Sequence, residues 1–390
     1  ADFLRPEQTC EPHTWTPAGM ITLYAGPGDW RNVRHHARRL AGTDTVRETL
    51  PAERREVCEA RFEPTPLVTL DDRVTARLVV DNLRARAVTG SAQLSTPSGL
   101  GADRCAFELG EVTHDRPFED SIALTLAPGA AAYESRLALS TQLFDKEISL
   151  HTVRLGTRDA VQVAAKGENW IINNGRTRFT VTPGFTGALS SWVEGGLEHL
   201  LSPYPEVKTF GWMSPWHGGL TPLAMHRNEM PGKLGLETFT TAPVEAPDGR
   251  GIPWTGVRLR CQMVRDKLLG LSVELDYLTV GRGNVLKLVY RIRNETTAWR
   301  YLGGGWHAFW QLDGTREHNT LYSAEIQRKP TPWGSWSDAG RWGINTNAQT
   351  GRTAILVSPY PCVRLSDWND LGGHLGFIDQ IEVDAMGVAE

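Results

Sequence analysis

The stretch that decides the fold is VRLRCQMVRDKLLGLSVELDYLTVGRGNVLKLVYRIR, residues 257–293. Apolar residues take every second position in three segments of it, centred near Leu259, Val273 and Leu288. Charged and polar residues fill most of the positions between them, which is typical of strands with one buried face and one wet face. The turn Gly281-Arg282-Gly283-Asn284 between the second and third segments predicts a hairpin.

Outward from this stretch, the chain divides into three expected parts. Residues 1–65 are expected to be a helical or linker segment, in which Asp29 precedes apolar residues at helical spacing. Residues 66–156 contain short alternating segments separated by turns, which is typical of a small immunoglobulin-like β-sandwich. Residues 165–390 carry longer, aromatic-rich segments and are expected to form one large antiparallel β-sandwich. The predicted fold class is therefore all-β, with a short helical segment at the N-terminus.

Composition narrows the classes of partner. The chain has 390 residues, with 41 Lys and Arg against 45 Asp and Glu, a net charge of −4. This balance argues against a general nucleic-acid or anionic-membrane binder. Since a membrane span needs about 18 consecutive apolar residues, which the sequence lacks, no membrane partner is expected.

The five cysteines, at positions 10, 58, 105, 261 and 362, have no metal-ligand spacing. They are expected to be buried thiols, and one or two disulfides are the alternative for a secreted protein. No motif predicts a cofactor or a metal. The chain as given begins Ala1-Asp2 without a signal peptide or initiator Met, so we expect a processed chain or a piece of a longer protein, and the sequence indicates no compartment.

Aromatic residues concentrate on three expected loops. The first is Trp212–Leu220, where His217 is followed by two glycines that allow close backbone approach to a ligand. The second runs from Gly303 to Gly314, and the third from Trp333 to Asp338. Flat apolar faces beside polar edges are typical of ligand sites, although packing between two sheets explains the same residues. The candidate substrate-binding residues are Trp216, His217, Trp306, Trp336 and Asp313.

The second loop also predicts a strand with two different faces. After Gly303-Gly304-Gly305, strand alternation places His307, Phe309 and Gln311 on one face. Trp306 and its alternating neighbours then lie on the other face, toward the core.

At this point the sequence resembles the galactose mutarotase (aldose 1-epimerase) supersandwich family. The run Asn284–Asp313 resembles the family's strand that leads to a His-x-Phe-type motif, with His307–Leu312 as that motif. Upstream, Trp216–Gly219 resembles the family's His-Gly-Gly segment, and Phe179–Leu201 resembles its opening hairpin. The resemblance covers about residues 165–390.

The resemblance implies an acid and a base on either side of a pyranose. His307 would be the acid that protonates the ring oxygen, and His217 would hold the sugar. The family's base is a glutamate near the C-terminus, for which Glu382 is the candidate and Asp367 the rival. The arginine that the family carries before its His-Gly-Gly segment is not evident, and Lys208 is the nearest cation.

Three functions are consistent with these patterns. The chain is a carbohydrate-binding lobe of a larger carbohydrate-active protein, or a catalytic aldose 1-epimerase, or a protein-interaction module without a sugar. The family's missing arginine and the poor motif around Glu382 favour the first. Its implied partners are a carbohydrate ligand and a further domain or chain.

Overall fold

The computed structural model describes residues 58–64, 66–83, 86–129, 131–209, 214–226, 234–235, 237–324, 327–328, 336–359, 362–366, 374–383 and 386–389. The expected helical segment lies outside these residues. Strands and two short 3₁₀ helices, η3 (Asp266–Leu268) and η4 (Arg316–His318), form the regular structure of the described part. The all-β prediction is confirmed.

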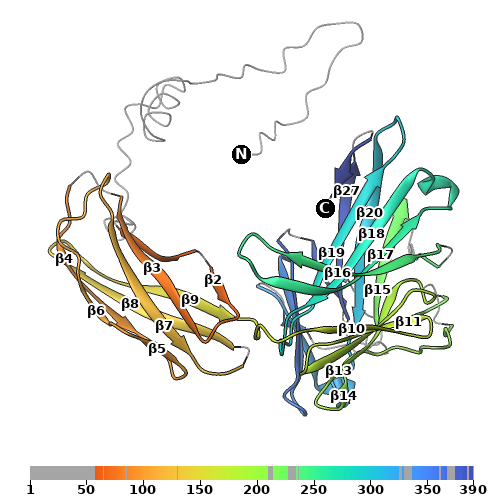
Figure 1. Cartoon of the computed structure of the whole chain (residues 1–390), viewed down its shortest axis with the longest axis horizontal. Coiled ribbons are helices and arrows are strands. Elements are labelled where there is room, and N and C mark those ends of the chain that lie inside the picture. Colours follow the sequence, from red (N-terminus) through yellow and green to blue (C-terminus); the bar gives the residue numbers. More distant parts are fainter. Residues whose placement is uncertain are drawn as a thin grey trace, which may run out of the picture. The chain divides into compact units, whose positions relative to one another are not determined.

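The strands up to residue 154 form two sheets, which Figure 1 shows facing each other. One has the order β1-β3-β7-β5, with bounds Cys58–Glu63, Arg73–Asn82, Phe118–Leu126 and Leu100–Ala102. The other has the order β2-β9-β8-β4-β6, with bounds Leu67–Thr69, Asp145–Arg154, Ala131–Thr141, Gly90–Ser95 and Ala106–Glu108. Strand alternation buries Leu78, Ile122 and Leu137 completely. The sheets begin at Cys58, within the range expected to be helix or linker.

A ten-stranded sheet dominates the rest of the chain. Its order is β10-β11-β12-β13-β15-β20-β27-β26-β23, and β14 pairs with β13 beside this path. The bounds of β10 to β15 are Gln162–Lys166, Asn169–Asn173, Thr177–Thr182, Ala188–Glu194, Leu197–Glu198 and Leu220–His226. Those of β20, β27, β26 and β23 are Arg300–Phe309, His374–Val383, Val363–Ser366 and Trp336–Gly340.

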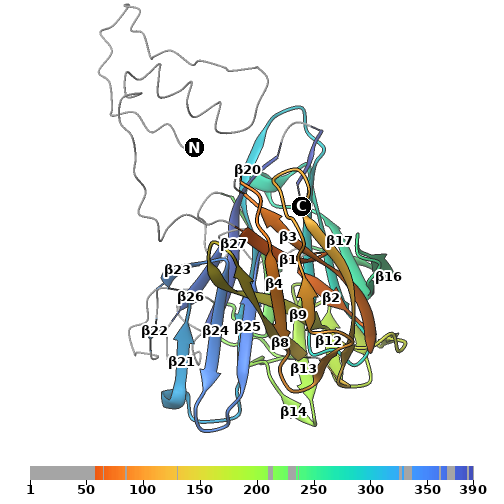
Figure 2. The same ribbon diagram turned by 90° about the vertical axis from the view of Figure 1, so that its left-hand side faces the viewer.

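Two smaller sheets complete this part. The five-stranded sheet has the order β16-β17-β18-β19-β28, with bounds Thr240–Pro247, Pro253–Gln262, Leu271–Thr279, Lys287–Asn294 and Val388–Ala389. The four-stranded sheet has the order β22-β21-β24-β25, with bounds Gln327–Arg328, Asn319–Tyr322, Trp342–Asn347 and Thr353–Val357. Figure 2 shows β21, β24 and β25 side by side.

The stretch 257–293 behaves as its alternation predicts. It forms β17, β18 and β19, with Leu259 opposite Leu275 and Leu275 opposite Tyr290 in the antiparallel register. These residues join Phe179 of the ten-stranded sheet in one core, so the two sheets pack face to face. The predicted hairpin at Gly281–Asn284 connects β18 to β19.

Trp306 lies at the centre of this core. Its side chain is 1% exposed, its indole N–H donates to the Tyr277 hydroxyl at 3.3 Å, and its ring packs edge-on against Tyr290. We therefore remove Trp306 from the candidate substrate-binding residues, because no surface of it is left for a ligand.

Candidate functional site

His307 lies in the middle of the ten-stranded sheet. On β20 it is opposite Thr221 of β15 and Gly376 of β27, on the face away from Trp306. The two-faced strand predicted from the glycine-rich loop is thus formed. The His307 side chain, however, is only 2% exposed.

Aromatic rings surround both candidate histidines. The His217 ring lies 4.6 Å from that of Phe185, and the Trp216 ring lies 5.6 Å from that of Phe309 at 89°. Phe309 in turn contacts His307, with 6.1 Å between ring centroids. We call these five residues the histidine–aromatic cluster. None of them is more than 7% exposed, so the sugar groove expected on Trp216, His217 and His307 is not open here.

The glycine pair after His217 serves the chain's own packing. Gly218 and Gly219 have φ values of 59° and 62°, in the left-handed region that favours glycine. A Cβ atom at Gly218 would lie 2.4 Å from the carbonyl oxygen of Leu201, and one at Gly219 would lie 2.4 Å from that of Leu189. The close approach that these glycines allow is therefore to neighbouring backbone.

The expected acid and base are far apart. Glu382 is opposite Tyr301 in the β20–β27 register, whereas His307 is opposite Gly376. Six residues of strand separate the two positions, which is about 20 Å. Since a pyranose ring cannot bridge that distance, Glu382 cannot act as the base for an acid at His307. The rival base Asp367 and the side chain of Trp336 lie outside the described residues. Lys208, the nearest cation, pairs with Trp216 through backbone hydrogen bonds of 2.7 and 3.1 Å.

Asp313, by contrast, lines an open cleft. It has a φ of 55° at the turn after β20, and its side chain is 46% exposed. The cleft has a volume of about 580 Å³. Its lining residues are Leu201, Trp310, Gln311, Leu312, Asp313, Gly314, Thr315, Asn319, Gln349 and Thr350. We call it the Asp313 cleft.

The Asp313 cleft has an apolar floor and a polar rim. Leu201 supplies its partly exposed apolar surface, whereas Leu312 and Trp310 lie beneath at 4% and 7% exposure. The Trp310 ring packs against Trp192 at 5.6 Å. On the rim, Gln311 and Gln349 are exposed, and Gln349 Oε1 accepts from the backbone N–H of Thr315 at 2.9 Å. The cleft thus offers an amide, a carboxylate and hydroxyl groups above an apolar surface.

Glu198 anchors the turn beside this cleft. Its Oε1 accepts from the backbone N–H groups of Trp192 at 2.8 Å, His199 at 3.1 Å and Leu200 at 3.0 Å, while Oε2 accepts from the Ser191 hydroxyl at 2.5 Å. Four such bonds to one carboxylate hold the chain that leads into Leu201. The sequence gives no signal for this role, because a single glutamate near a glycine pair carries no motif.

His199 and Arg352 extend the polar cluster around Asp313. The guanidinium of Arg352 lies 3.1 Å from the Asp313 carboxylate. Burial, together with the charge of Arg352, lowers the pKa of His199 below its usual value. His199 is therefore held in its neutral form near the cleft at physiological pH.

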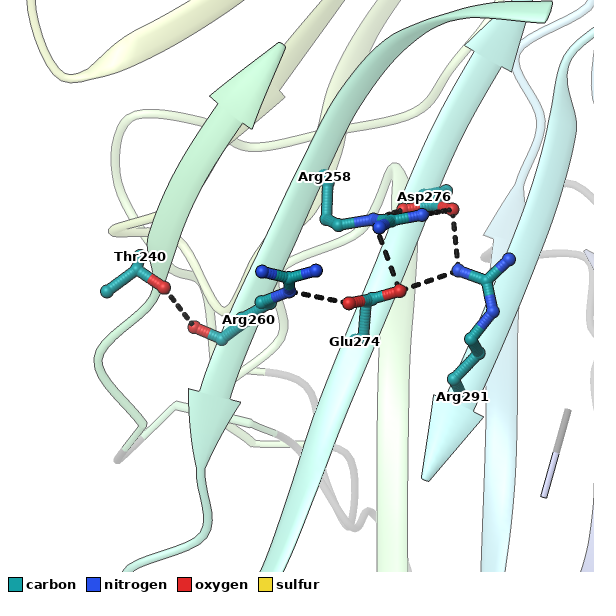
Figure 3. Close-up of polar contacts among 6 residues, drawn as sticks. All are labelled: Thr240, Arg258, Arg260, Glu274, Asp276 and Arg291. Carbon is teal, nitrogen blue, oxygen red and sulfur yellow. Dashed lines mark hydrogen bonds and ion pairs between the residues drawn. The ribbon is translucent and has the colours of Figure 1, made fainter. Parts of the chain in front are cut away.

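A second polar surface covers the outer face of the five-stranded sheet. Figure 3 shows Arg258 and Arg291 converging on Asp276, with Glu274 between them. Arg258 donates to both oxygens of Asp276, at 2.6 and 2.8 Å, and Arg291 donates at 2.8 Å. Asp276 is fully buried by these contacts.

This ion cluster forms part of the wall of a shallow groove of about 740 Å³. The groove is also lined by apolar side chains, by threonine, serine and glutamine, and by a further arginine and glutamate. Glu274 accepts from Arg260 and Arg291. Because the carboxylates of the cluster are already paired with arginines, we interpret the cluster as structural.

Three negative findings apply to the described residues. They contain no group of three or more His, Cys, Asp or Glu side chains arranged to hold a metal ion. None of their helices has the length and apolar character needed to cross a membrane. No disulfide joins the four cysteines at positions 58, 105, 261 and 362.

Comparison with known proteins gives no family. No family model and no curated protein matches the sequence. Among solved structures, the Slr1438 protein from Synechocystis sp. PCC 6803 is 11% identical, with a TM-score of 0.33, and the match covers 60% of this chain and 93% of that chain. The chicken CNTN1 FN1-FN3 domains are 9% identical, with a TM-score of 0.13, and the match covers 83% of this chain and 99% of that chain.

Proposed function

We propose that residues 165–390 form a carbohydrate-binding lobe of a carbohydrate-active protein, and that the Asp313 cleft is its sugar site. The observation that carries the proposal is the pairing of an apolar floor with a rim of amide and carboxylate groups. A sugar ring has a matching character, since it combines apolar C–H faces with a belt of hydroxyl groups. The volume of the cleft, about 580 Å³, lies within the usual 300–1,000 Å³ of small-molecule sites.

The hydrogen-bonding groups on the rim suit hydroxyl ligands. Each sugar hydroxyl both donates and accepts, while the Asp313 carboxylate accepts only and the Gln311 amide does both. Arg352 fixes the Asp313 carboxylate from one side and leaves it nearly half exposed on the other. A preorganised acceptor of this kind reduces the entropy lost on binding.

Binding without catalysis is favoured over epimerisation. The acid and base that the mutarotase resemblance implies are about 20 Å apart along the strands. Asp313 and Arg352 already form an ion pair, so neither is poised as a free acid or base. The large antiparallel sandwich of β10 to β28 supports the architectural part of the resemblance to galactose mutarotases, which we retain as a proposal.

Isothermal titration calorimetry with a panel of neutral hexoses and short oligosaccharides tests the proposal. Asp313→Asn keeps the size of the side chain and a residue type that tolerates positive φ, but it removes the charge. Because hydrogen bonds to charged groups contribute about 1.5–3 kcal/mol, it should weaken binding roughly 10- to 150-fold. Gln311→Ala should weaken binding less, by several-fold.

Glu108→Gln on β6 is the matched control, because it removes an exposed carboxylate far along the chain from the cleft. It should leave the affinity unchanged. If the folded wild-type protein binds nothing on the panel, the protein-interaction module becomes the better hypothesis. If binding occurs but both cleft variants retain full affinity, the sugar site lies elsewhere.

A further inference from the structure

Two aromatic rings lie at the start of β20, one exposed and one partly buried. Trp299 is 55% exposed, and its ring lies nearly parallel to that of Tyr301, at 26° with 6.2 Å between centroids. A tryptophan held this far out of the core leaves a large apolar face in water. Aromatic side chains beside a few polar groups are a usual lining of small-molecule pockets.

These rings form one side of a small pocket of about 230 Å³. Its other lining residues come from the end of β15, from η3 and from the starts of β18 and β20. They are His226, Lys267, Leu268, Leu271 and Arg300. We call it the Trp299 pocket. Its volume is below the 300–1,000 Å³ typical of drug-sized ligands, which suits a ligand with a single ring.

Three of the side chains that line the pocket are basic. His226, Lys267 and Arg300 line it, and the described lining residues include no carboxylate. The Nε atom of Arg300 is buried and makes no hydrogen bond to any described residue. On β27, Glu382 is opposite Tyr301 in the register and Val383 is opposite Arg300. A guanidinium with an unsatisfied buried donor at the wall of a pocket favours an anionic ligand.

We propose that the Trp299 pocket binds a pyranose that carries one anionic substituent. The apolar face of the sugar ring would stack on Trp299, and the carboxylate or phosphate would contact Arg300. The proposal concerns a separate site and does not depend on the Asp313 cleft. It adds a requirement for negative charge that the Asp313 cleft, with its own carboxylate, does not have.

Calorimetry of the full chain at low ionic strength compares glucuronate, glucose 6-phosphate, glucose and acetate as ligands. We expect glucuronate or glucose 6-phosphate to bind at least tenfold more tightly than glucose and acetate, and these two arms distinguish a carboxylate from a phosphate. Binding should weaken as salt is added, because exposed charges are screened. An equal loss of glucose and glucuronate binding in Arg300→Gln would overturn the role of charge, and equal affinity for acetate would overturn the role of the ring.

Three variants assign the binding to this pocket. Trp299→Ala should weaken binding roughly 2- to 12-fold, the range that an aromatic contact typically contributes, without unfolding the chain since the side chain is exposed. Arg300→Gln should weaken it about tenfold or more. Glu108→Gln, which changes an exposed carboxylate outside both proposed sites, should leave it unchanged. Weaker binding of glucuronate or glucose 6-phosphate in Trp299→Ala and Arg300→Gln, with glucose binding unaffected, separates this proposal from the sugar site of the Asp313 cleft. Full affinity in both Trp299→Ala and Arg300→Gln would refute the proposal.

Discussion

Replacing Asp276 by alanine tests whether the ion cluster of the five-stranded sheet is structural. The side chain is fully buried and accepts three charge-assisted hydrogen bonds, two from Arg258 and one from Arg291. Removing one partner of a buried ion pair typically lowers the free energy of unfolding by about 3–5 kcal/mol, because the remaining buried charge is left uncompensated. Here both arginines keep a contact with Glu274, at 3.2 and 2.6 Å. We therefore expect the lower end, a loss of about 3 kcal/mol in the free energy of unfolding.

Urea denaturation followed by tryptophan fluorescence measures this loss directly. The matched control is Arg260→Ala, which removes a 60% exposed partner of Glu274 and should cost less than about 1 kcal/mol. The double variant Arg258→Ala, Asp276→Ala should cost less than the sum of its parts, since the two residues share one interaction. If the free energy of unfolding of Asp276→Ala lies within about 1 kcal/mol of the wild-type value, the two arginines do not need this carboxylate and the reasoning is refuted.

Four other predictions concern the histidines, a turn and the glycine pair. Glu198→Ala should lower the free energy of unfolding by roughly 3 kcal/mol in a urea titration, because three backbone N–H groups lose their acceptor, whereas Glu198→Gln retains an acceptor and should lose less than half as much. Gly219→Ala should cost roughly 1–3 kcal/mol by thermal melting, since its Cβ would clash with the Leu189 carbonyl oxygen, and an unchanged melting temperature would contradict the overlap. His307→Ala should destabilise the fold by about 2–5 kcal/mol, as for other large buried side chains, and a stable variant would show that the ring is not needed for packing. Burial lowers the pKa of His199, so the unfolded chain binds a proton more readily and stability should fall as the pH drops below about 6.5; His199→Gln should flatten this dependence in melts between pH 5 and 7, and an equal slope would exclude His199 as its source.

Strand alternation predicted the parts of the fold in which the two faces differ in chemistry. Residues 257–293 carry apolar side chains on one face and arginines with carboxylates on the other, so the strands and their buried face could be read from the sequence. Cys58–Glu63 was missed as a strand because charged residues precede it closely and its own alternation is short.

The candidate site was predicted only in part. Strand alternation shows which residues lie on the same face of a sheet, but it does not show whether other parts of the chain cover that face. His307 and Trp306 lie on opposite faces of β20 as expected, yet both are buried. Asp313 was selected from the turn after β20 and does line a cleft. The sequence did not predict Trp299 as a site residue, because its neighbours in the chain do not show whether a tryptophan is exposed or buried.

Strand β20 connects the two proposed sites through one rigid element. The Trp299 pocket lies at its start and the Asp313 cleft at its end, ten residues later, which is about 30 Å along the strand. A polysaccharide with repeated units can occupy both sites with one molecule, so the second contact forms at a high effective concentration. Two individually weak sites would then give strong retention on a polymer and almost none on its monomers. The spacing along β20 also sets a minimum chain length, below which this gain in avidity disappears.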